Sequence, residues 1–324
     1  MKKFNPFEVN ILEEGVKLYI KSIGEDIKIT DEAKIKEEGV KLYIKSICED
    51  IKIAESEGKF PIMTVDYMKK IEKEILAKLK NTENKTHIKF NNNSIREAVE
   101  LWLEDENSAE KKYGHISDWD VRNVTDMNSL FNRAESFNED ISNWNVSKVT
   151  NMSNMFSDAI SFNQNIGVWD VSNVIDMSEM FACALNFNKD IGNWDVSKVT
   201  NMSGMFNGAE DFDQEIGFWD VSKVTDMSVM FRGAKRFWGE LSSWDVSNVL
   251  DMSDMFNGAD SFIADISGWN VSKVVNMNEM FSQADSFNQD LSSWNVENVE
   301  SCEGFDDGCE GDAFVLPNFT KCSI

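Results

Sequence analysis

Acidic side chains recur at a constant interval in the second half of the chain, and they are the residues best suited to chemistry. One regularly spaced set comprises Asp140, Asp190, Glu215, Glu240, Asp265 and Asp290. Carboxylates stacked about 5 Å apart repel one another unless water hydrates them or cations bind them. We therefore predict a solvated acidic ridge at these residues. Calcium is the alternative, because it prefers carboxylate oxygens, although no segment has the spacing of a known calcium loop.

The chain offers little material for catalysis. Its two histidines, His87 and His115, are too few for a histidine-based triad or metal site, and we expect His115 to cap a turn. The sequence contains no phosphate loop, dinucleotide fingerprint or nucleophile elbow. Paired acids serve glycosidases, but carboxylates that recur in every repeat indicate a structural role. We predict no catalytic residue, no enzyme activity and no bound cofactor.

The five cysteines do not form a regularly spaced framework. They are Cys48, Cys183, Cys302, Cys309 and Cys322. The N-terminus lacks the apolar segment of a signal peptide and a lipobox, so we expect these cysteines to be thiols. The last three crowd the C-terminus, where we expect them to pack in a terminal cap. A disulfide there, or a zinc site that lacks its fourth ligand, is the alternative.

Composition excludes several classes of protein. The 324 residues include 32 Lys and Arg against 57 Asp and Glu, for a net charge of −25. Phosphate binding needs clustered basic residues, so nucleic acid is not the expected partner. No stretch approaches the roughly 20 apolar residues that a membrane span needs. We expect a soluble protein of the cytoplasm, or one associated with a virion.

A tryptophan recurs every 25 residues from the end of the first third onward. The tryptophans are Trp119, Trp144, Trp169, Trp194, Trp219, Trp244, Trp269 and Trp294. Acidity follows the repeat, because residues 1–114 carry a net charge of −2 and residues 115–324 carry −23. We predict a helical region at 1–80, a linker at 81–93, a capping helix and lead-in segment at 94–114, a repeat array of about eight coils at 115–300 and a C-terminal cap at 301–324.

Each repeat combines two periodicities. In the repeat that begins at Trp144, Met152, Met155, Phe156 and Ala159 have helical spacing, whereas Trp144 and Val146 alternate as in a strand. We predict one short parallel strand and one short helix per repeat, stabilised by stacking. Good N-cap residues precede each predicted helix, namely Asp126, Asn151, Asp176, Asn201, Asp226, Asp251 and Asn276. Asx-turn residues follow each tryptophan, namely Asp120, Asn145, Asp170, Asp195, Asp220, Asp245, Asn270 and Asn295.

The N-terminal region contains a duplication of its own. Residues 13–29 recur almost unchanged at 37–53, and their apolar spacing favours two amphipathic helices, with short strands as the alternative at the Ile-Lys-Ile ends. These segments offer a route to self-association. A further helix is predicted at 65–80. Another is predicted at about 95–105, with Ser94 and Glu97 as its capping box and Ile95, Ala98, Val99, Trp102 and Leu103 as its apolar stripe.

One coil departs from the repeat. Arg232, Lys235 and Arg236 bring basic charge into an acidic array, Trp238 replaces the Asn that most coils carry, and Ile263 replaces it one coil later. A Trp with Arg neighbours is typical of binding hot spots. We predict a partner-binding patch at these five residues, with drift in a tolerant loop as the alternative.

The repeat motif resembles a known family. Residues 169–174 (WDVSNV), 205–209 (MFNGA) and 286–294 (SFNQDLSSW) are similar to the BspA-like surface-protein repeat, a domain of unknown function found in mycoplasma lipoproteins, listerial surface proteins, protists and large DNA viruses. The resemblance covers residues 115 to about 300 and extends to the lead-in segment 94–121. It implies an α/β solenoid similar to leucine-rich repeats and a role in surface or protein contacts.

These observations favour a binding protein. The first expectation is a non-enzymatic scaffold for protein–protein interaction that uses the acidic ridge and the patch. An adhesin on a cell or virion surface is the alternative, and an enzyme of unknown type is a second one. The sequence names no partner.

Overall fold

The computed structural model describes residues 88–309 and 314–323. The chain divides into two compact units, Met1–His87 and Ile88–Ile324, and the description below concerns the second. The helices predicted within residues 1–80, the self-association through 13–53, and His87 lie outside the described residues. Residues 88–93, predicted to be part of a linker, belong to the second unit, where Phe90 is buried and Lys89 forms a parallel bridge with Asp120.

Within residues 88–118, two helices and one short 3-10 helix precede the array. They are α4 (Asn92–Glu104), α5 (Glu106–Tyr113) and η1 (Ile116–Asp118). Helix α4 begins before the predicted Ser94 cap, because the Asn91 side chain accepts from the backbone N–H groups of Asn93 and Ser94, each at 3.0 Å. Ser94 is the third helical residue, and its hydroxyl accepts from the Asn91 N–H at 2.9 Å. The capping box is therefore Asn91 with Ser94.

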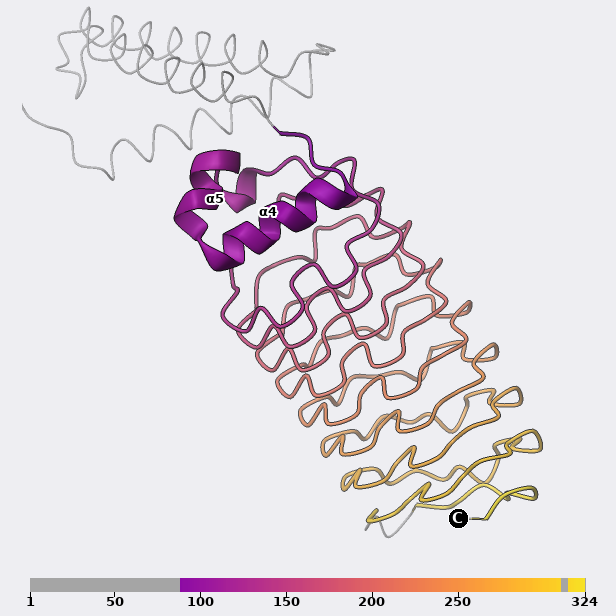
Figure 1. Ribbon diagram of the computed structural model, residues 1–324. Helices are drawn as coiled ribbons and strands as arrows, with labels where there is room; N and C mark the ends of the chain where they lie inside the picture. The colour runs from indigo at the N-terminus through magenta and orange to yellow at the C-terminus, as the bar shows by residue number, and fades with distance from the viewer. Residues whose placement is uncertain (1–87, 310–313, 324) are drawn as a thin grey trace, which may run out of the picture. The chain divides into compact units, whose positions relative to one another are not determined.

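One face of α4 covers the first coil of the array (Figure 1). Ile95, Ala98, Val99 and Trp102 are buried as predicted, whereas Leu103 is 44% exposed and does not belong to the buried stripe. The Trp102 ring packs edge-on against Trp119, with ring centroids 5.8 Å apart. This packing shields the first tryptophan, which has no preceding coil of its own.

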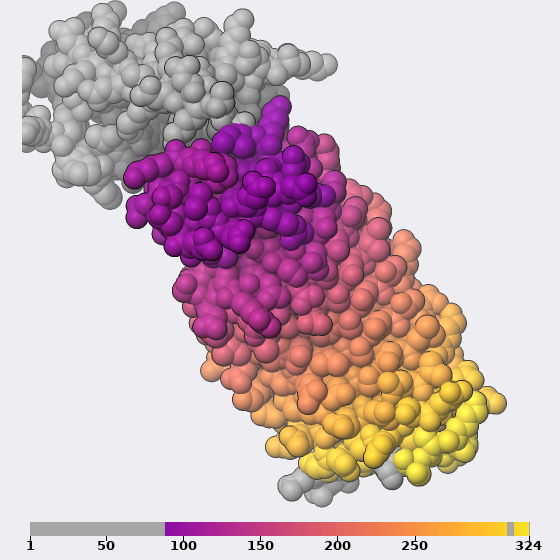
Figure 2. All heavy atoms as spheres, in the orientation of Figure 1, coloured from indigo at the N-terminus to yellow at the C-terminus, as the bar shows by residue number. Residues whose placement is uncertain are grey.

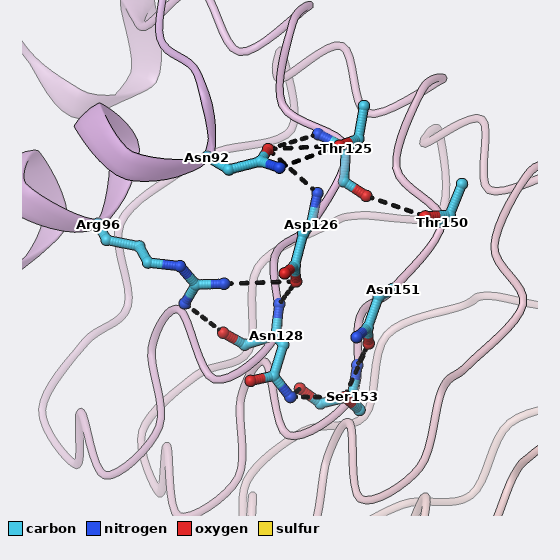
Figure 3. A network of polar contacts seen from close by, with 8 residues as sticks. All are labelled: Asn92, Arg96, Thr125, Asp126, Asn128, Thr150, Asn151 and Ser153. Carbon is cyan, nitrogen blue, oxygen red and sulfur yellow. Dashed lines mark hydrogen bonds and ion pairs between the residues drawn. The ribbon is translucent and has the colours of Figure 1, made fainter.

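Polar groups of α4 also replace the missing coil (Figure 3). In later coils the backbone N–H at the Thr125 position donates to the coil before it, as from Thr150 to the Thr125 carbonyl at 2.8 Å. Thr125 has no such coil, and its N–H donates instead to the Asn92 side-chain oxygen at 2.8 Å. Arg96 donates to the Asn128 carbonyl, which also faces the open end of the array. The edge of the first coil is therefore satisfied by side chains.

The array itself is a stack of coils, each running from one tryptophan to the residue before the next (Figure 1). Isolated parallel bridges join residues 25 positions apart, from Asp126 with Asn151 to Asn276 with Ser301. Apart from Ser301, these bridging residues are those predicted as N-caps, and the strand predicted at Trp144 and Val146 is not present there. In Figure 2 the described residues form one continuous surface, along which the colour passes in chain order from indigo to yellow.

Equivalent apolar residues stack in the interior. Rings of successive coils lie parallel, as for Trp219 and Trp244 (centroids 6.5 Å apart) and for Phe206 and Phe231 (5.7 Å). From Trp144 to Trp294, each indole N–H donates to a carbonyl 28 residues earlier, at 2.9–3.2 Å. Each of these indole rings is thus buried with its only hydrogen-bond donor paired.

The short helix predicted in each coil is not present. Met152, Met155, Phe156 and Ala159 are buried as expected, but residues 153–158 form consecutive turns. Alternate N–H groups bond to the next coil, as from Phe156 to the Met180 carbonyl at 2.9 Å. The N–H groups between them close four-residue turns, as from Met155 to the Met152 carbonyl at 3.1 Å. Half of the amides therefore point along the array and cannot join an α-helical ladder.

Left-handed backbone explains this geometry. Two residues four positions apart have positive φ in successive coils, such as Asn154 (57°) with Asp158 (58°) and Gly204 (61°) with Gly208 (67°). A left-handed residue interrupts a right-handed helix, and glycine adopts this conformation at least cost. Val229 holds the same conformation at 62° although its side chain is β-branched.

The C-terminal end is closed by a tail and a disulfide. Val315 adds a last bridge to Asp290, and the Phe314 ring packs edge-on against Phe287 with centroids 5.2 Å apart. Cys302, predicted as a thiol, forms a disulfide with Cys322, because the tail brings their Cα atoms to 5.8 Å. Zinc binding by the three C-terminal cysteines is therefore ruled out in this state, since two of them are bonded to each other.

Replacing Gly233 by Ala tests the left-handed positions. A Cβ at Gly233 would meet no atom closer than 3.7 Å, so the cost comes from its φ of 64°. We expect a loss of about 1 kcal/mol in the free energy of unfolding, measured by urea denaturation. Gly268→Ala is the control, because its surroundings are open and its φ is not positive; equal stability of the two variants would contradict the argument.

Reduction tests the C-terminal closure. Removing a crosslink over 20 residues is expected to cost about 2–4 kcal/mol. Dithiothreitol should therefore lower the stability of the wild-type protein and raise hydrogen exchange in residues 301–309. A Cys302→Ser/Cys322→Ser variant should already show both effects and should not respond to the reductant. A wild-type protein insensitive to dithiothreitol would refute the closure.

Candidate interaction surface

The basic residues of the predicted patch are paired with acids of neighbouring coils. Lys235 Nζ lies 2.7 Å from Glu210, and Arg236 lies 2.9 Å from Asp211. Arg232 lies 3.5 Å from Asp254 on the other side. The three positive charges of the patch are thus paired with carboxylates of the array itself.

Trp238 interrupts a ladder of side-chain hydrogen bonds. In earlier coils the backbone N–H at this position donates to the side chain one coil before, as from Asn163 to Asn138 (2.9 Å) and from Asn188 to Asn163 (3.1 Å). The Trp238 indole N–H bonds instead to the Asp213 carboxylate at 2.7 Å, and the side chain remains 49% exposed. A large apolar ring thus replaces a small amide at the surface.

Ile263 continues the interruption in the next coil. Its side chain is 50% exposed, and its carbonyl accepts from the Gln289 side chain at 3.0 Å. The following residues are also altered, because Gly239 and Ala264 stand where other coils carry Gln, Glu or Lys. Two adjacent coils therefore lose the polar ladder together.

The patch and the acidic ridge share one side of the array. Trp238 and Glu240 are both exposed and flank the buried Gly239, and Ile263 and Asp265 are both exposed and flank the buried Ala264. This alternation of exposed and buried residues places each pair on the outer side of its coil. All six ridge residues are exposed. The structure therefore joins two features that the sequence presents separately.

Several ridge carboxylates hold turns. Asp140, Asp265 and Asp290 accept from the N–H two residues later, at 2.9–3.0 Å. Hydrogen bonds from the serine hydroxyl and N–H at these turns lower the pKa of the three carboxyls. In the part of the chain that the structure describes, no three His, Cys, Asp or Glu residues are grouped as metal ligands.

The other predicted polar residues also accept backbone hydrogen bonds. The Asn151 side chain accepts from the Ser153 N–H at 2.9 Å, although no helix follows, and Asp195 accepts from Ser197 at 3.1 Å in an Asx-turn. His115 caps η1, and its Nδ1 accepts from the Ser117 N–H at 3.3 Å. The predicted Asx-turn at Asp195 and the cap at His115 are thus confirmed, whereas Asn151 holds a turn and not the N-terminus of the predicted helix.

Two cysteines of the described residues are thiols, as predicted. Cys183 and Cys309 are partly buried, and desolvation raises the pKa of both, that of Cys309 to about 11. The Cys309 thiol donates to the Phe281 carbonyl at 3.0 Å. A raised pKa leaves little thiolate at neutral pH, so neither residue has the character of a nucleophile.

The structure reveals exposed apolar residues that the sequence reasoning missed. Phe218 is 91% exposed and Val168 is 70% exposed, both in the turn before a tryptophan. Ile175 and Leu250 are exposed by 48% and 46%. Their signal in the sequence is the same as that of Trp238, an apolar residue at a position where most coils carry a polar one.

The repeat identifies a family. The profile described as "Mycoplasma protein of unknown function, DUF285" matches residues 102–218 and 201–311, and the two matches together span well over half of the chain. The chain belongs to this family. No curated protein and no solved structure matches it. Membership of the DUF285 family explains the repeat and assigns no activity.

No helix among residues 88–309 and 314–323 has the length and apolar character to cross a bilayer.

Acid should destabilise the turns of the ridge. A carboxyl whose pKa is lowered on folding adds stability above its ordinary pKa of 3.8 and loses that contribution as the pH falls through the folded-state value. The variant Asp140→Asn/Asp265→Asn/Asp290→Asn keeps the accepting oxygens without the titration. We expect its melting temperature to fall less between about pH 4 and 2 than that of the wild-type protein. Parallel curves by circular dichroism would contradict this.

Proposed function

We propose that this DUF285 protein is a non-enzymatic scaffold for protein–protein interaction, built as a leucine-rich-repeat-like solenoid of the BspA-like type. The observation that carries the proposal is the broken ladder at Trp238 and Ile263, which leaves two half-exposed apolar side chains on adjacent coils. Aromatic anchors on a rigid surface are typical of binding hot spots.

The charges around the anchors support a protein partner. Arg232, Lys235 and Arg236 each form an ion pair within the array. Replacing any of them would therefore break an ion pair of the array in addition to any contact with the partner. The neighbouring ridge stays exposed and acidic. Apolar anchors beside a charged rim resemble the usual arrangement of a protein interface.

A specific observation favours the second candidate, an adhesin on a cell or virion surface. The disulfide between Cys302 and Cys322 is of a kind that persists in oxidising compartments and is rare in the cytosol. Labelling of intact host cells or virions with an antibody to the array separates this candidate from a scaffold in the cytoplasm.

Restoring the ladder tests the proposal without disturbing the fold. The variant Trp238→Asn/Ile263→Asn carries Asn at both positions, as the coils of Asn163 and Asn188 do. A host protein captured by the wild-type chain should, once purified, bind this variant about tenfold or more weakly, as measured by calorimetry. Leu250→Thr is the control, because it also restores the usual residue of its position. Equal affinities for wild type and both variants would refute the interface.

A further inference from the structure

The Phe218 side chain is exposed at a position where the array does not require an apolar residue. At 91% it is the most exposed large apolar side chain among the described residues, and Val168 follows at 70%. Both occupy the last position of their coils, two coils apart, where the other coils carry small or polar residues. Those residues are Asn143, Asn193, Ser243, Gly268 and Ser293. The array therefore forms this turn without an apolar residue.

The turn presents Phe218 on a firm backbone. The N–H of Trp219 closes the turn onto the Ile216 carbonyl at 3.1 Å. A Cβ added at Gly217 would lie 2.3 Å from the Glu240 carbonyl, so the backbone here is pressed against the next coil. A side chain held on a fixed backbone loses less entropy when a partner covers it.

Carboxylates lie in the sequence on both sides of this turn. Glu215 precedes Phe218 by three residues and Asp220 follows it by two, and Asp190 and Asp195 hold the equivalent positions around Asn193 one repeat earlier; all four are exposed. The chain carries a net charge of −25, which repels a second copy and attracts cationic partners. The negative charge around Phe218 thus favours a positively charged partner.

Basic residues nearby do not cancel this field. Lys223 lies on the turn that follows Phe218, and Lys198 lies on the equivalent turn one repeat earlier, where its ammonium group donates to the Asn173 side chain at 2.6 Å. The whole array from residue 115 onward retains a charge of −23.

We propose that Phe218 and Val168 anchor a basic protein segment whose apolar side chains cover them and whose lysines and arginines pair with the flanking carboxylates. Two coils separate the anchors by about 10 Å, which is close to the distance between residues i and i+7 of a helix. A basic amphipathic helix therefore fits the spacing and the charge. This surface uses no residue of the Trp238 patch, so either interface can fail without the other.

A designed peptide tests the proposal directly. The probe is a fluorescent helix of about 14 residues with Leu on one face and Lys elsewhere, titrated with the full chain at about 0.15 M salt and followed by anisotropy. We expect Phe218→Asn to weaken binding about tenfold or more. The Asn is the residue found at this position in two other coils, so the fold should be kept, and circular dichroism checks this.

Control variants separate anchoring from general attraction by charge. Leu250→Thr and Trp238→Asn/Ile263→Asn should bind the peptide as the wild-type chain does. Replacement of Lys by Glu in the peptide should abolish binding. Wild-type affinity in Phe218→Asn, an equal loss in Leu250→Thr, or binding of the Glu peptide would each overturn the proposal.

Discussion

Hydrogen bonds between successive coils are the constraint on which this structure depends. Every second amide in the turn segment donates to a carbonyl in the following coil, so each coil must repeat the backbone of its neighbours. The pair of left-handed residues, the 25-residue period and the parallel bridges all follow from that requirement. Tryptophan, methionine and phenylalanine can then stack in register, because their backbones already do.

The same constraint makes the two ends of the array costly. In the first coil, the Thr125 N–H has no preceding coil to accept its hydrogen bond, and the Asn128 carbonyl has none to donate to it. Helix α4 supplies the acceptor through Asn92 and the donor through Arg96. The last coil is covered by apolar packing of Phe314 and by the bond between Cys302 and Cys322. Aromatic rings thus cover both ends, and polar side chains complete the first end whereas a crosslink completes the last.

Freedom of sequence is left to the outward positions. There, a departure from the repeat costs little stability, and departures that expose apolar surface are the best indicators of contact with other molecules. Trp238 and Ile263 break a polar ladder, whereas Phe218 and Val168 replace small polar residues in a turn. The acidic positions between and around them give both surfaces the same electrostatic character.

The sequence alone determined the period, the buried residues and the polar acceptors, because burial and side-chain type are written directly into a regular repeat. It also indicated the patch, through the loss of the usual Asn at Trp238. It did not determine the turn backbone, because the spacing of Met152, Met155 and Phe156 fits a helix as well as a chain of turns. Only contacts between residues 25 apart decide between them. The partners of Arg236, the exposure of Phe218 and the disulfide of Cys302 likewise depend on which coils lie side by side, and only the tertiary structure supplies that information.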